Sequence, residues 1–106
     1  MIVRDDVPLG VALAQTIHAA GQSAQLPGAA AAEPPTTAVA LAAPVAELVA
    51  LARTLDAAGI ACVLIREPDE PWRDAPMALG VVPAPRALVR RFVAHLPLMR
   101  GKADHV

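Results

Sequence analysis

The sequence predicts a three-layer α/β/α single domain built on a four-stranded mixed sheet. The chain has 106 residues, which is the size of one compact domain. Residues of the AVILMFWYC set make up 56% of it, and they are mostly Ala, Val and Leu, which suit closely packed layers of helix and sheet. Short apolar segments of strand length alternate with segments of helical spacing, which predicts the order β-α-β-α-β-β-α over residues 1–106.

The first half of the chain is expected to form a strand, a helix and a second strand. Residues 1–4 are a short apolar segment of strand type. Asp5 and Asp6 precede Pro8, and this pattern is typical of a helix start, because a carboxylate can cap free N–H groups and proline needs no donor there. The helix should reach about residue 24, before a low-complexity loop at residues 25–35. The second strand is expected at residues 36–42.

The second half is expected to add a helix, two strands and a last helix. Pro44 should open an amphipathic helix that ends at Gly59, a residue suited to the left-handed turn after a helix. Residues 60–65 are continuously apolar, as in strands buried on both faces. A polar loop is expected at residues 66–76, and a last strand at residues 77–82. A short helix is expected at residues 86–96, and a frayed tail at residues 100–106.

The charge balance argues against a strong long-range field for nucleic acid. Nine basic and ten acidic residues leave a net charge of −1. The basic residues are concentrated near the carboxyl end, because residues 81–106 carry a net +4 and residues 1–80 a net −5. Any contact with a polyanion should therefore come from the last quarter of the chain or from helix N-termini.

Cysteine usage and hydropathy favour a cytoplasmic protein that does not enter membranes. Cys62 is the only cysteine, which excludes an internal disulfide and a cysteine zinc cluster. Charges at residues 4–6 interrupt the start before any secretory signal could form. The longest apolar stretch, residues 38–46, is far shorter than the roughly 20 residues of a membrane span. No cofactor or metal is expected, because the acidic residues lack the spacing of a metal-binding loop.

A candidate site is predicted at the carboxyl ends of the first and third strands. In open α/β sheets, sites form outside the carboxyl ends of parallel strands. Polar residues 4–6 and 66–69 end these strands, so both clusters lie on one rim if the strands are parallel neighbours. The first helix begins there too, and its free N–H groups near Gly10 favour an anion such as a phosphate. With Gln15 and His18 on that helix, the rim is predicted to be a hydrolytic or phosphate-binding pocket.

Several short motifs occur in a fixed order along the chain, and together they resemble a known pattern. The chain begins with the motifs V-R-D-D at residues 3–6 and P-L-G at residues 8–10, and these are followed by A-Q-T-I-H-A at residues 14–19. G-I and then I-R-E-P-D follow within residues 59–69, and A-L-G-V-V-P-A occupies residues 78–84. This succession, which covers nearly the whole chain apart from one loop and the tail, resembles the type II peptidyl-tRNA hydrolase family.

The resemblance implies a three-layer α/β protein, often a homodimer, that hydrolyses the ester between a peptide and the 3′ end of tRNA without a metal. Its catalytic residues would be His18, Glu67 and Gln15. His18 would carry a proton, Gln15 would orient a water or a ribose hydroxyl, and Glu67 would act as general base if burial raises its pKa. Asp6 and Gly10 would help to bind the end of the tRNA.

Three positions depart from the family pattern, and the loss of the lysine and the threonine defines the alternative function. Val11, or a near neighbour, occupies the column of a family lysine, and Ala75 falls where the family carries a threonine. Glu67 falls in the column of the family carboxylate but is one methylene longer than the usual Asp. The alternative is a catalytically degenerate relative that binds a ligand, RNA or a protein by the same rim. An open cleft at the three predicted catalytic residues would favour the enzyme, and a rim closed by Trp72 would favour the binding module.

Several candidates also have a purely structural interpretation. Asp6 could cap the first helix, and His18 could be a hydrogen-bonded residue at the edge of the core. Trp72 could cover the core edge rather than stack on the terminal adenine of tRNA. Arg86 and Arg90 could bind tRNA phosphates or form the solvated face of an amphipathic helix.

Overall fold

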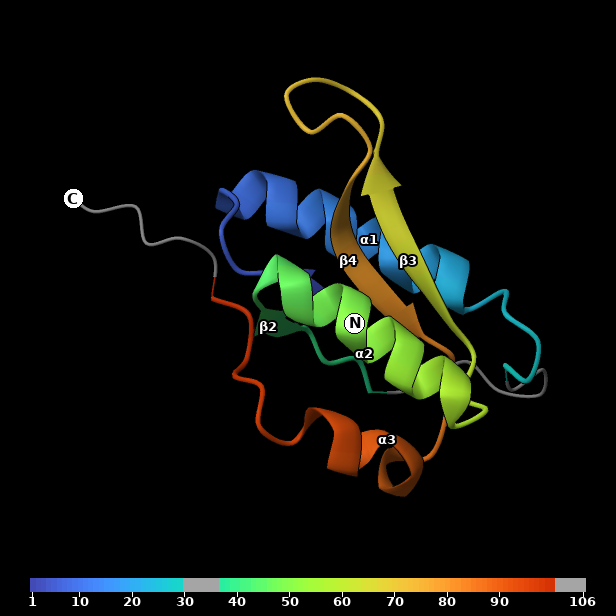
Figure 1. Cartoon of the computed structure of the whole chain (residues 1–106). Coiled ribbons are helices and arrows are strands. Elements are labelled where there is room, and N and C mark those ends of the chain that lie inside the picture. Colours follow the sequence, from blue (N-terminus) through green and yellow to red (C-terminus); the bar gives the residue numbers. More distant parts are fainter. Residues whose placement is uncertain (30–36, 101–106) are drawn as a thin grey trace.

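The computed structural model describes residues 1–29 and 37–100. Its elements follow the predicted order β-α-β-α-β-β-α (Figure 1). They are β1 (Ile2–Arg4), α1 (Leu9–Ser23), β2 (Leu41–Ala43), α2 (Val45–Ala57), β3 (Cys62–Glu67), β4 (Ala75–Val81) and α3 (Arg86–Val93). The second strand is shorter than predicted, because it begins at Leu41. Most of the predicted 25–35 loop and all but the first residue of the 100–106 tail lie outside the described residues.

The four strands form one mixed sheet in the order β2-β1-β4-β3. β1 pairs with β2 in parallel, while β4 is antiparallel to both β1 and β3. β1, β2 and β3 therefore run in one direction and end at the same edge of the sheet. The first and third strands are not neighbours, because β4 lies between them, but they run in the same direction and their carboxyl ends share one rim.

Helices cover both faces of the sheet, which makes the predicted three layers. Ile2 packs with α2 and Val3 packs with α1, because successive side chains of a strand point to opposite faces. α1 and α2 accordingly lie on opposite sides of the sheet (Figure 1). Side chains of α3 also pack on the α2 side, through Phe92 and Val93.

A bulge and a glycine adapt β4 to its neighbours. Ile65 of β3 lies opposite Ala78, and the next residue of β3 lies opposite Pro76, so Met77 is the extra residue of the bulge. Gly80 allows α1 to pack closely, since a Cβ at Gly80 would lie 2.5 Å from the carbonyl oxygen of Ala19. The close contact brings the inner face of α1 against the sheet beside β3.

The segment after α3 extends the sheet beyond β2. Ala42 donates its N–H to the carbonyl of Pro97 at 2.9 Å, and Met99 donates to the carbonyl of Ala40 at 2.8 Å. Leu41 and Leu98 form the antiparallel bridge between these two bonds. Residues 97–99 are thus held against the sheet. In the described part of the chain, no helix combines the length and the hydropathy needed to cross a bilayer.

Candidate functional site

The turns that follow β1 and β3 meet at one rim, as the sequence predicted. The guanidinium of Arg4, the last residue of β1, lies over the ring of Trp72, 5.3 Å from its centroid. Nη1 of Arg4 also donates to the carbonyl oxygen of Pro76 at 3.0 Å. Arg4 thereby joins the end of β1 to the loop that leads from β3 into β4.

Gln15 of α1 reaches the end of β3 and holds Glu67. The side chain of Gln15 is buried between α1 and the sheet, with 4% of its surface exposed. Its Nε2 donates to Oε2 of Glu67 at 3.1 Å, and the backbone N–H of Asp69 donates to Oε1 of Glu67 at 3.2 Å. Two residues that are 52 positions apart in the chain are therefore joined at the predicted site.

The hydrogen bond from Gln15 lowers the pKa of the Glu67 carboxyl, and the N–H of Asp69 and the nearby charge of His18 act in the same direction. The expectation that burial raises the pKa of Glu67 is therefore wrong, because hydrogen bonds to the ionised carboxylate outweigh its desolvation. Glu67 is consequently a carboxylate at neutral pH. It can accept a proton, but it is a weaker base than a buried glutamate would be.

The other end of the Gln15 amide is unpartnered. Its Oε1 is buried and has no hydrogen-bond partner among the described residues. A buried acceptor without a donor costs free energy of about 1–3 kcal/mol. Because this oxygen is enclosed between α1 and the sheet, the group that Gln15 offers to the site is its Nε2, which holds Glu67.

His18 lies one turn further along α1, on the same side as Gln15, and its side chain is exposed. It makes no hydrogen bond within the described chain, so the interpretation of His18 as a hydrogen-bonded residue at the core edge is wrong. Its charge acts on Glu67. The three predicted catalytic residues are therefore together, with Gln15 buried, Glu67 half-buried and His18 exposed.

Asp6 and Gly10 lie at the same rim but differ from their predicted roles. Both oxygens of Asp6 pair with Arg4, at 2.6 Å to Nε and 2.8 Å to Nη2. The N-cap of α1 is Pro8, without a side-chain cap, so the interpretation of Asp6 as the helix cap is wrong. Gly10 is exposed, and a Cβ there would meet no atom within 4 Å. A ligand can therefore approach the first turn of α1 closely.

Arg86 and Arg90 are far from this rim. α3 follows the carboxyl end of β4, and β4 runs opposite to β3, so these arginines lie toward the other edge of the sheet (Figure 1). With Arg91 and two alanines, they line a shallow depression on the outer side of α3. The structure therefore does not bring them together with Gln15 and Glu67.

Three further positions bear on the alternative function. Val11 and Ala75, which stand where the resemblance would place a lysine and a threonine, pack against the core under α1. Trp72 is half-buried and packs against the same core, as its structural interpretation predicts. No group of three His, Cys, Asp or Glu side chains in the described ranges could hold a metal ion.

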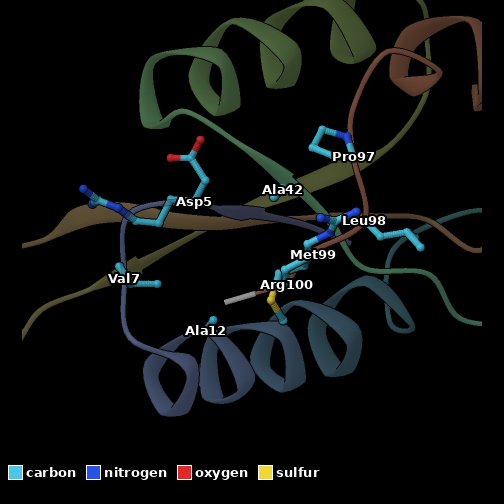
Figure 2. Close-up of a pocket in the computed structure, with 9 residues that line it drawn as sticks. Asp5, Val7, Ala12, Ala42, Pro97, Leu98, Met99 and Arg100 are labelled. Carbon is cyan, nitrogen blue, oxygen red and sulfur yellow. The ribbon is translucent and has the colours of Figure 1, made fainter. Parts of the chain in front are cut away.

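A hollow of about 340 Å³ lies beside this site, and the sequence did not predict it. Figure 2 shows it bounded by Asp5 and Val7 after β1, by Ala12 of α1, by Ala42 of β2 and by residues 97–100. None of the three predicted catalytic residues lines it. Residues 97–100, which follow the last helix, form one wall. This wall was not predicted, because the backbone hydrogen bonds that hold residues 97–99 against β2 leave no signature in the side chains.

No family model matches the chain, and no curated protein matches it either. The function must therefore be inferred from the residues of the site and from the motifs that they form.

Proposed function

We propose that the protein is a hydrolase of the type II peptidyl-tRNA hydrolase kind, which cleaves the ester between a peptide and the 3′ end of tRNA. One observation carries the proposal, namely the hydrogen bond from Gln15 to Glu67 at 3.1 Å. It joins the two motifs on which the resemblance rests, A-Q-T-I-H-A and I-R-E-P-D, in one site. It also fixes a carboxylate on the rim beside an exposed histidine.

The residues have distinct roles in this reaction. Glu67 accepts a proton from a water molecule, and the resulting hydroxide adds to the ester carbonyl. The bond to the 3′ oxygen of tRNA then breaks, and protonated His18 donates the proton that this oxygen needs. The products are a peptide with a free carboxyl group and tRNA with a free 3′ hydroxyl. Gln15 holds Glu67 in place through the hydrogen bond from its Nε2.

Binding of the tRNA end uses the loop after β1. The first N–H groups of α1, near Gly10, have no partner within the helix and favour a phosphate. Asp6 shapes this loop through its pair with Arg4. Arg86 and Arg90 contact phosphates further along the tRNA, since neither side chain is engaged in an ion pair in the described structure. Because this substrate belongs to translation, we propose that the protein is cytoplasmic.

We also propose that the protein is a homodimer that pairs through the outer face of α1. Leu9, Leu13 and Ile17 recur every four residues on that face and are 43%, 49% and 70% exposed. α1 contains no Asp, Glu, Lys or Arg, although a solvated helix face normally carries such charges. A second copy presents the same uncharged stripe, as a two-fold symmetric interface requires.

A catalytically degenerate relative that binds a ligand, RNA or a protein is the second candidate. Val11 and Ala75 favour it, because neither can supply the hydrogen bonds of a lysine or a threonine. Trp72, held under Arg4, favours it too, because this contact covers part of the rim. On this proposal the same rim binds its partner without turnover.

The test is hydrolysis of N-blocked aminoacyl-tRNA by the purified full chain. The wild-type protein should release the blocked amino acid, and Glu67→Gln and His18→Ala should each slow release by about 10²–10⁴-fold, the usual contribution of a general acid or base. Glu70→Gln is the matched control, because it makes the same change on the same loop at an exposed side chain. Absence of turnover in the wild type would favour the binding module. Turnover that both substitutions leave intact would refute the mechanism.

A further inference from the structure

One edge of the sheet is covered by the chain itself, whereas the other edge is open. Residues 97–99 hydrogen-bond to β2 at the first edge. β3 lies at the opposite end of the strand order, and in the described part of the chain it pairs only with β4. Figure 1 shows β3 at the border of the sheet, with α1 and α2 on its two sides. An open strand edge of this kind is a template for a further strand.

The register of β3 on β4 determines which backbone groups face outward at this edge. Val82 donates its N–H to the carbonyl of Ala61 at 3.0 Å, and Asp74 donates its N–H to the carbonyl of Glu67 at 2.7 Å. Successive residues of a strand direct their backbone groups alternately to its two sides. The N–H and C=O groups that point away from β4 are therefore those of Cys62, Leu64 and Arg66.

The edge lacks the features that usually protect an exposed strand. Residues 60–65 contain no charged residue and no proline, although such residues commonly block strand edges. Val63 and Leu64 are half-buried, whereas Met77 and Leu79 of β4 are fully buried. Val63 packs on the α1 side of the sheet and Leu64 on the α2 side. A strand added beside β3 would therefore cover apolar surface on both faces.

The open edge is continuous with the candidate site. β3 ends at Glu67, and the carboxylate of Glu67 is held by Gln15 of α1. Neighbouring strands lie about 4.8 Å apart. A peptide that ran beside β3 in the same direction would therefore bring its carboxyl end next to Glu67, the residue that activates water in the proposed reaction.

We propose that this edge binds the peptide part of the ester as an added strand, parallel to β3. The inference rests on the proposed hydrolase activity, which supplies the identity of the ligand. The last peptide residue keeps its carbonyl free beside Glu67, so the penultimate residue and the residue two before it direct their backbone groups to β3. Main-chain hydrogen bonds supply the affinity in this mode of recognition, so the edge accepts peptides of widely different sequence. Proline is disfavoured at a residue that faces β3, because it has no N–H to donate.

The test is a titration of the ¹⁵N-labelled full chain with the acetylated peptide amide Thr-Val-Thr-Val, followed by backbone amide shifts and hydrogen exchange. The peptide should produce saturable shifts at residues 62–66. Exchange at the N–H groups of Leu64 and Arg66 should slow, because both become donors to the peptide. The N–H groups of Val63 and Ile65 already face β4 and should change less. Residues 41–43, at the covered edge, should not respond.

Two N-methylated forms of the peptide provide the matched comparison. Methylation of the penultimate residue removes an N–H that faces β3, so it should weaken binding by about 10-fold, the effect of about one net hydrogen bond. Methylation of the residue before it removes an N–H that points away from β3, so it should leave binding nearly unchanged. The protein is the same in both titrations, so its folding does not affect the comparison.

The inference is overturned if the peptide does not saturate these amides at about 20 mM, where a millimolar site would be mostly filled. It is also overturned if the two methylated peptides bind equally well. Protection of the Leu64 N–H that rises with protein concentration in the free protein would overturn it too, because two copies would then pair through β3. Failure of the hydrolase is a separate result, since its assay uses a single N-blocked amino acid, which is too short to pair with a strand. A protein that binds the peptide in this register without hydrolysing the ester would support the strand site and refute the hydrolase.

Discussion

Gln15 governs the ionisation of the site, although it has no charge of its own. Its amide is buried, and its hydrogen bond is the largest of the contributions that lower the pKa of Glu67. An ionised Glu67 that is held in this way contributes to stability at pH values above its pKa in the unfolded chain. This contribution is lost as the pH falls through the lower pKa of the folded state. The hydrogen bond from Gln15 therefore contributes to the acid limb of the stability profile.

Replacing Gln15 with leucine should raise the pKa of Glu67 toward its ordinary value, because the main donor to the carboxylate is removed. A ¹³C NMR titration of the Glu67 carboxyl measures this shift. The loss of stability on acidification should also become shallower in the variant. Gln22→Leu is the control, since Gln22 lies on the same helix but is exposed. An unchanged pKa in Gln15→Leu would show that the Asp69 N–H or the charge of His18 dominates.

The contact between α1 and β4 holds Gln15 where it can reach β3. Gly80 makes this contact possible, because its missing Cβ leaves room for the backbone of α1 at Ala19. Any larger residue at position 80 would push the helix outward, since backbone atoms cannot rotate aside as a side chain can. Such a substitution should therefore also move α1 relative to β3 and lengthen the distance from Gln15 to Glu67.

Gly80→Ala should lower the free energy of unfolding by about 1–3 kcal/mol, the usual effect of overpacking a close contact. Urea denaturation measures the difference. Gly21→Ala provides the control within the same helix, because a Cβ at Gly21 meets no atom within 4 Å. That change should raise stability by about 0.5–1 kcal/mol, since alanine loses less backbone entropy in a helix. Equal effects of the two substitutions would contradict the close packing of α1 on β4.

At the scale of the whole molecule, the proposed dimer rests on one uncharged helix face. Ile17→Asp should convert the dimer into a monomer, because a charge would be buried in the apolar stripe. Size-exclusion chromatography with light scattering distinguishes the 10.9 kDa chain from a species of twice that mass. Leu88→Asp is the matched control, as Leu88 is 56% exposed but lies on α3. A monomeric wild type, or a dimer that survives Ile17→Asp, would refute this interface.

Local signals were sufficient to predict the elements and their order. Pro8 and Pro44 each stand directly before a helix, as predicted from the sequence, and Pro85 does the same before α3. Gly59 has a φ of +78° after α2, which agrees with its predicted role as a helix terminator. Such signals act over a few residues, so the sequence carries them without reference to the rest of the fold. The type of each element, and the expectation that the turns after β1 and β3 meet at one rim, followed from these signals.

Contacts between distant segments were decided by the tertiary structure alone. The insertion of β4 between β1 and β3, and the pairing of residues 97–99 with β2, depend on backbone hydrogen bonds that any residue can make. The sequence by itself determined which groups could do chemistry, whereas the packing of α1 on the sheet decided that Gln15 lowers the pKa of Glu67. Ionisation depends on neighbours in space, and those neighbours are set by long-range packing.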